Sequence, residues 1–98
     1  MTITKHQNGT NLEIALEGRL DTTTAPELEA ELNQSMPGAE SLTLDFAKLE
    51  YISSAGLRVL LSAHKAMAPK GGMKVVRANE IVMEVFQVTG FADILTVE

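Results

Sequence analysis

Two neighbouring serines lie at the point where the residue pattern changes from strand to helix. Ser53 and Ser54 follow an extended run that ends at Ile52, and Gly56 stands in the first expected helical turn. Such a turn has backbone N–H groups without partners and a partial positive charge, so a serine there can cap the helix or, once phosphorylated, hold a dianion. The spacing alone leaves both roles open. Because glycine costs about 1 kcal/mol against alanine inside a helix, we expect another backbone or a ligand to approach Gly56 closely.

Catalysis by these serines is not expected. Ser54 lies in Ile-Ser-Ser-Ala-Gly, which differs from the Gly-x-Ser-x-Gly elbow of serine hydrolases. The candidate bases are His6, in a terminal strand, and His64, which falls on the apolar stripe of the helix, too far along its axis for direct contact. We therefore predict that the chain is not an enzyme and that its serine is a substrate of another protein.

The sequence also offers no clear metal or cofactor site. It contains no Cys and two isolated His, which give no recognisable ligand spacing. Gly71-Gly72 reads as a turn and not as a Walker loop, since no Gly-Lys-Ser/Thr follows. Asp21, Asp45 and Glu50 could gather near the serines and bind Mg²⁺, but acidic residues at strand ends are usually just solvated. We expect no metal and no cofactor.

The composition is that of a small globular domain. The chain has 98 residues, 45% of them hydrophobic, and 13 acidic against 8 basic side chains give a net charge of -5. This charge disfavours nucleic acid and anionic membranes as partners. No apolar run approaches the ~20 residues of a membrane span, and the first residues lack a secretory signal. We expect one domain over residues 1–98, monomeric, without membrane insertion and located in the cytoplasm.

Hydrophobic periodicity predicts alternating strands and helices. Strands are expected at Thr2–His6, Leu12–Glu17, Ser41–Phe46, Met73–Arg77 and Ile94–Val97. Helices are expected from Ala25 to the Met36-Pro37-Gly38 stop, from the serines to about Ala68, and between Asn79 and Gly90. A capping box of Thr24 and Glu27 should begin the first helix. The predicted fold class is α/β, a single small domain with a mixed sheet of four to five strands and about three helices mainly on one face.

Three segments carry a family pattern, in order and at the right separations. Residues 17–25, Glu-Gly-Arg-Leu-Asp-Thr-Thr-Thr-Ala, are similar to a Gly-x-Leu-Asp turn before a first helix, and residues 45–61 contain the serine turn. Residues 85–91, Val-Phe-Gln-Val-Thr-Gly-Phe, are similar to a Leu-Phe-x-x-x-Gly-Leu segment. Together they resemble the STAS domain family, and specifically its stand-alone bacterial anti-sigma factor antagonists. The resemblance covers nearly the whole chain and implies a STAS fold.

The resemblance implies a switch at the serine turn. In that family the first Ser of an Asp-Ser-Ser/Thr-Gly turn is phosphorylated by an anti-sigma factor that is also a serine kinase, and a PP2C-type phosphatase reverses it. Alignment on Gly56 implies phosphorylation at Ser54, with Ser53 as the other candidate. The unphosphorylated form would bind the anti-sigma factor and release a sigma factor, and phosphorylation would block this binding. The implied partner-binding surface comprises Asp21, Thr22, Thr23, Ser53, Ser54, Ala55, Gly56 and Arg58.

Two other functions stay open on the sequence. STAS domains also accompany anion transporters and lipid-transport complexes, so the chain could be a subunit of such a system. A helix N-terminus is also a common anion site, which would suit a nucleotide or small-ligand sensor.

Overall fold

The computed structural model describes residues 1–98, which form a five-stranded sheet, three α-helices and two short 3₁₀ turns. In chain order the elements are β1 (Thr2–Asn8), β2 (Asn11–Leu20), α1 (Ala25–Ser35), η1 (Met36–Gly38), β3 (Ser41–Ile52), α2 (Ser54–Met67), β4 (Met73–Val76), α3 (Glu80–Thr89), η2 (Phe91–Asp93) and β5 (Thr96–Val97).

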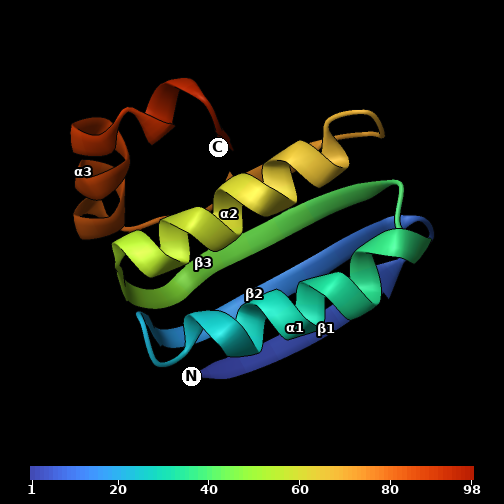
Figure 1. The fold of residues 1–98 in the computed structure, drawn as a ribbon, viewed down its shortest axis with the longest axis horizontal. Coiled ribbons are helices and arrows are strands. Elements are labelled where there is room, and N and C mark those ends of the chain that lie inside the picture. The colour runs from blue at the N-terminus through green and yellow to red at the C-terminus, as the bar shows by residue number, and fades with distance from the viewer.

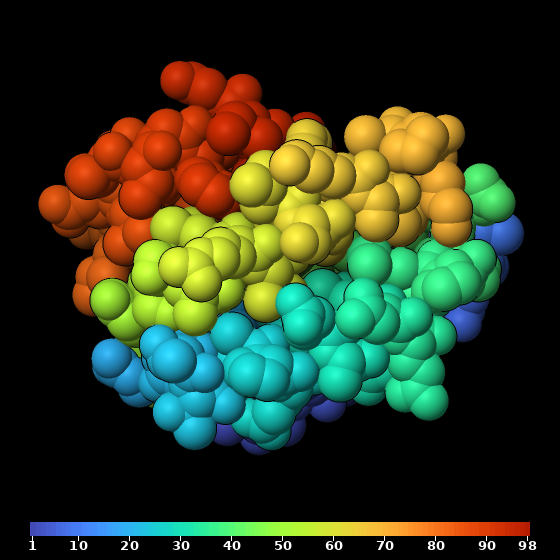
Figure 2. All heavy atoms as spheres, in the orientation of Figure 1, coloured from blue at the N-terminus to red at the C-terminus, as the bar shows by residue number.

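The sheet is mixed, with its strands in chain order from β1 to β5. β1 and β2 form an antiparallel hairpin, and every later neighbour is parallel. The helices α1 and α2 lie side by side across one face of the sheet, and α3 lies to the side, past the first turn of α2 (Figures 1 and 2). The predicted α/β class and mixed sheet are confirmed.

Alternating side chains of the central strands form the core under α1 and α2. The buried residues Leu12, Ile14 and Leu16 of β2 alternate with polar or small neighbours, as the sequence predicts. Fully burying one leucine side chain is worth about 1.5–3 kcal/mol, and these three residues belong to one core cluster with the buried residues of both helices. Their buried positions are Ala25, Leu28 and Leu32 of α1, and Gly56, Leu57, Val59, Leu60, Ala63 and Met67 of α2.

The strand β3 is longer than predicted. The sequence pattern assigns residues 47–51 to a connection, whereas in the structure they belong to the strand. Two register shifts against β2 explain the difference. β3 carries one extra residue between the pairs Ala15–Asp45 and Glu17–Lys48, and another between the pairs Gly18–Leu49 and Arg19–Tyr51. The first bulge resets the alternation, and Leu49, not Lys48, is buried. Sheet pairing therefore continues to Ile52 and delivers the chain directly to the serines.

The C-terminal part follows the prediction in its helix but not in its strands. α3 has Asn79 as its N-cap, whose side chain accepts a hydrogen bond from Val82 N at 2.8 Å, and the left-handed Gly90 as its C-cap. β4 stops before Arg77, because that residue has φ +59°. The predicted strand over residues 94–97 shrinks to β5, since the chain forms η2 after Gly90 and the side chain of Ile94 stays 45% exposed.

Candidate functional site

The β2–α1 loop and the β3–α2 turn lie at the same end of the molecule, on the left in Figure 1. Leu20 pairs with Ile52 at the ends of the two parallel strands, and Ser53 N donates to Leu20 O at 2.8 Å. The carboxyl edge of parallel strands is where α/β folds commonly bind ligands. The segments that the sequence singles out, residues 17–25 and the serine turn, are thus neighbours in the fold.

The two serines have different structural roles. Ser53 is the N-cap of α2: its backbone is extended and its Oγ accepts from Gly56 N at 3.5 Å, a long contact. Ser54 is the first residue of the helix and is exposed, whereas Ser53 is half-buried. Capping and display of a hydroxyl, which the sequence leaves as alternatives for one position, are therefore divided between two neighbouring residues.

Gly56 is buried and packs against the ends of both strands. A Cβ at this position would lie 2.7 Å from Leu20 Cγ and 2.9 Å from Ile52 Cγ1. The close approach expected from the sequence is thus made by two core side chains. It lets the first turn of α2 lie low on the sheet, and it fixes the height at which Ser54 is presented.

The loop before α1 is organised by the Asp21 carboxylate. Its Oδ1 accepts from Thr23 N at 3.0 Å and from Thr24 N at 3.1 Å, which satisfies two backbone donors ahead of the helix. These hydrogen bonds, that from Thr24 N first, lower the pKa of Asp21 below its usual value. The carboxylate is therefore a structural part of the loop.

The predicted capping box at Thr24 is wrong. Thr24 precedes α1 with a helical backbone, φ -96° and ψ -19°, and its side chain makes no capping hydrogen bond. Its hydroxyl instead donates to Arg19 O at 2.8 Å and accepts from Asp21 N at 2.9 Å. The Thr24 side chain thus ties the loop to the end of β2 and does not cap α1.

A shallow hollow of about 180 Å³ separates the start of α1 from the start of α2. One wall comes from the predicted binding loop and α1, with Thr22, Pro26 and Glu29, and the other from Ala55 and Arg58. Arg58 is exposed, and its spacing of four residues from Ser54 puts the two on one side of α2. The hollow thus connects both halves of the predicted partner-binding surface.

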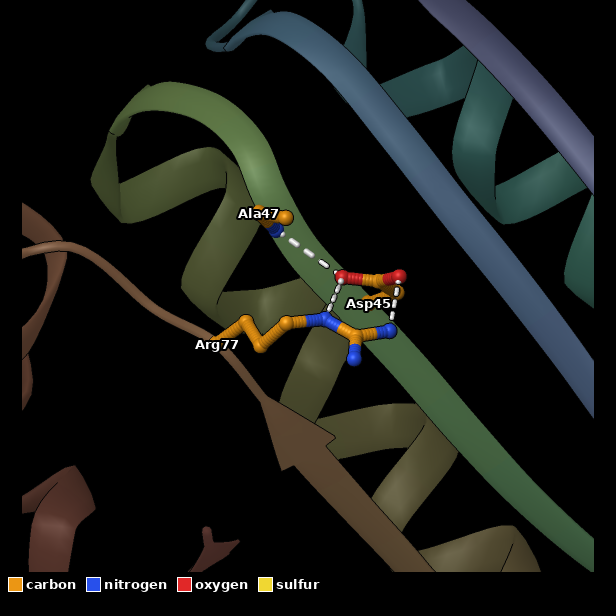
Figure 3. A network of polar contacts seen from close by, with 3 residues as sticks. All are labelled: Asp45, Ala47 and Arg77. Carbon is orange, nitrogen blue, oxygen red and sulfur yellow. Dashed lines mark hydrogen bonds and ion pairs between the residues drawn. The ribbon is translucent and has the colours of Figure 1, made fainter.

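Asp45, a candidate Mg²⁺ ligand in the sequence, instead pairs with Arg77. Its carboxylate accepts from Arg77, Nε to Oδ1 at 3.2 Å and Nη2 to Oδ2 at 2.6 Å, and also from Ala47 N at 3.0 Å (Figure 3). The hydrogen bonds from Arg77 are the main cause of the lowered pKa of Asp45. No group of three or more His, Cys, Asp or Glu residues is arranged to hold a metal ion. The carboxylate is occupied in joining β3 to the end of β4, a pairing for which the sequence gives no local signal.

His64 is half-buried on α2, and its Nδ1 has no hydrogen-bond partner. None of the helices combines the length and the apolar character that crossing a bilayer requires.

The chain matches the family described as "Mlab, STAS domain" over residues 3–96. BtrV of Bordetella bronchiseptica, which is named as an anti-sigma factor antagonist, is 38% identical over 84 residues; these cover 84% of this chain and 72% of BtrV.

Solved structures share the architecture. An anti-sigma factor antagonist from Mycobacterium paratuberculosis superposes with a TM-score of 0.88 at 21% identity, over 98% of this chain and 83% of the other. The Bacillus cell fate determinant SpoIIAA, in its phosphorylated form, superposes with a TM-score of 0.76 at 16% identity, over 99% and 91% of the two chains. At such identities the likeness establishes the fold.

Proposed function

The chain belongs to the STAS domain family, and from this premise we propose that it is an anti-sigma factor antagonist switched by phosphorylation of Ser54. The unphosphorylated chain binds an anti-sigma factor and so releases a sigma factor. A phosphoryl group on Ser54 blocks this binding. The proposal places these events in the cytoplasm and assigns the chain itself no catalysis.

The exposure of Ser54 is the observation that carries the proposal. A kinase must reach the hydroxyl that it modifies, and Ser54 is exposed while Ser53 is half-buried and caps α2. The first turn of a helix also suits a phosphate, because its N–H groups and partial charge favour an anion by about 0.3–1 kcal/mol. Phosphorylation at Ser54 is therefore compatible with the fold as it stands.

The switch follows from the cost of burying charge. A phosphoryl group adds about -1.5 to -2 charge at pH 7. Inside a packed interface this dianion must lose its water, which costs several kcal/mol unless the partner compensates it. A loss of about 2.7 kcal/mol already lowers affinity by about 10²-fold. We therefore assign release of the partner to a mismatch of surfaces and not to refolding.

The docking surface in this proposal consists of the Asp21 loop, the serine turn and Arg58. Thr22, Ala55 and Arg58 line one hollow, so a single partner surface can contact both segments. Gly56 is buried and contributes by holding the turn low on the sheet. The kinase in the proposal is the anti-sigma factor itself, and a PP2C-type phosphatase restores the free hydroxyl.

Phosphate mapping tests the site. The wild-type chain, Ser54→Ala and Ser53→Ala are each incubated with the cognate anti-sigma kinase and ATP, and the products are mapped by mass spectrometry. The proposal expects one phosphate on the wild type and on Ser53→Ala, and none on Ser54→Ala. Loss of the phosphate only in Ser53→Ala would assign the switch to Ser53 and overturn the proposed site.

A further inference from the structure

Arg58 is a free cation beside the serine turn. It is the one basic residue in the first two turns of α2, and it is exposed. The ion pairs of the structure join Lys5 to Glu31, Lys74 to Glu98 and Arg77 to Asp45, while Arg19 lies 4.7 Å above the ring of Tyr51. Arg58 takes part in none of these contacts. Its guanidinium is therefore available to an anion that arrives at the same end of α2.

The position of Arg58 matches that of a phosphate on Ser54. Both residues are in α2, four positions apart, and residues at this spacing have Cβ atoms about 5–6 Å apart on one side of the helix. The arginine side chain can span that separation and present two parallel N–H donors to phosphate oxygens. Ser53 is five positions away and turned into its cap, so it lacks this relationship.

The surroundings of Arg58 offer one competitor for its charge. The hollow that Arg58 lines is otherwise formed by apolar or uncharged residues, with Glu29 of α1 as its other charged group. Glu29 forms no ion pair with Arg58, since no nitrogen–oxygen contact of 4.0 Å or less joins them. A dianion outcompetes a single carboxylate that is not in contact, because its attraction for the guanidinium is larger at shorter range.

We propose that Arg58 is the internal counter-ion of phosphorylated Ser54, an inference that rests on the proposed function. In the unmodified chain Arg58 remains on the docking surface, over the hollow beside Glu29. After phosphorylation its guanidinium donates to the phosphate oxygens of the same helix. The modification thus changes the docking surface twice: it adds a dianion and it withdraws the cation that the partner would otherwise meet.

The test uses chains that carry phosphoserine at position 54, installed during translation so that no kinase is needed. Phosphorus NMR follows the second ionisation of the phosphate in the wild type, Arg58→Gln, Arg58→Lys and the control Lys65→Gln, which removes an exposed cation further along α2. A nearby cation favours the dianion and so lowers its pKa. We expect Arg58→Gln to raise this pKa by about 0.3 unit or more, the size of an i,i+4 ion pair. Lysine should restore part of the shift, and Lys65→Gln should leave the pKa unchanged.

A second readout reports on the arginine itself. The Nε–H resonance of Arg58 should shift on phosphorylation of Ser54 and lose protection when the phosphate is removed by alkaline phosphatase. Equal phosphate titrations in the wild type and Arg58→Gln, together with an unshifted Arg58 resonance, would overturn the proposal. Both measurements use the isolated chain, so they can fail while phosphorylation still blocks the partner, and they can succeed while it does not. Failure of the counter-ion and failure of the proposed function are thus distinguishable.

Discussion

Leu20, at the end of β2, occupies the space into which a side chain on Gly56 would project. Leu20 Cγ lies 2.7 Å from the position of a Cβ on Gly56, and Leu20 itself is fully buried. The glycine thus couples the serine turn to the strand that leads into the Asp21 loop. The height of the first turn of α2, and with it the presentation of Ser54, depends on the close approach of Gly56 to Leu20 and Ile52.

Gly56→Ala should therefore destabilise the fold, although alanine is the better helix former. Overpacking a dense core costs about 1–3 kcal/mol, while the gain in helix propensity is at most about 1 kcal/mol. Urea unfolding should show a net loss of about 1–2 kcal/mol. Gly38→Ala is the matched control, because a Cβ there meets nothing within 4 Å; it should change stability by less than about 0.5 kcal/mol. Wild-type stability in Gly56→Ala would contradict this prediction, because it would mean that the Leu20 and Ile52 side chains can move aside without cost.

The two serines should separate stability from regulation. Ser53→Ala removes the N-cap of α2 and should cost about 0.5–1 kcal/mol, at the low end of the usual range because the contact to Gly56 N is 3.5 Å long. Ser54→Ala should leave the free energy of unfolding within about 0.5 kcal/mol of the wild type, since the side chain is exposed. Thermal or urea unfolding of both variants checks this. A larger loss in Ser54→Ala than in Ser53→Ala would reverse the roles assigned to them.

The pairing of Asp45 with Arg77 should appear as a pH-dependent term in stability. The folded pKa of Asp45 lies below its ordinary value of 3.8. A lowered pKa means that the carboxylate stabilises the fold above that value and that this contribution is lost as the pH falls through the folded pKa. Asp45→Asn should cost about 1–2 kcal/mol at pH 7, and the gap to the wild type should close as the pH falls below 3.8.

An exposed ion pair supplies the control for that experiment. Lys74 and Glu98 approach to 3.6 Å with about half of each side chain exposed. Because exposed pairs contribute little, Glu98→Gln should change stability by less than about 0.5 kcal/mol at pH 7. A gap between Asp45→Asn and the wild type that stays constant from pH 7 to pH 3 would contradict the assignment.

Phosphorylation should leave the backbone of the domain in place. In the proposed switch, free N–H groups of the first turn of α2 and the Arg58 guanidinium accommodate the dianion, so no other element has to move. Backbone amide spectra of the chain with serine and with phosphoserine at position 54 should differ around residues 53–58 and coincide in β1, β4 and α3. Widespread shifts would show that the switch works through a conformational change.

The predictable features were those set by local patterns. Alternation along β2 and the Asn79 and Gly90 signals at the ends of α3 gave the right elements, because each depends on residues close in sequence. The serine turn was likewise placed correctly at the start of α2. Its site role and its partner contacts remain predictions.

The features that escaped prediction depend on distant or loop contacts. The extension of β3 requires bulges that are visible only in its register with β2. The backbone of Thr24 is held by the Asp21 carboxylate, so its hydroxyl faces Arg19 O and not the helix. A glycine at position 56 indicates a close approach, but nothing in the sequence identifies Leu20 as the side chain that approaches.

The most direct test of the central claim is the affinity of the chain for its anti-sigma factor, measured by calorimetry with serine and with phosphoserine at position 54. Ser54→Ala serves as the control, and it should bind like the unmodified chain. The account predicts that the phosphorylated chain binds at least about 10²-fold more weakly, since a dianion that must lose its water in the interface costs several kcal/mol unless the partner compensates it. Equal affinity of the two forms would contradict it.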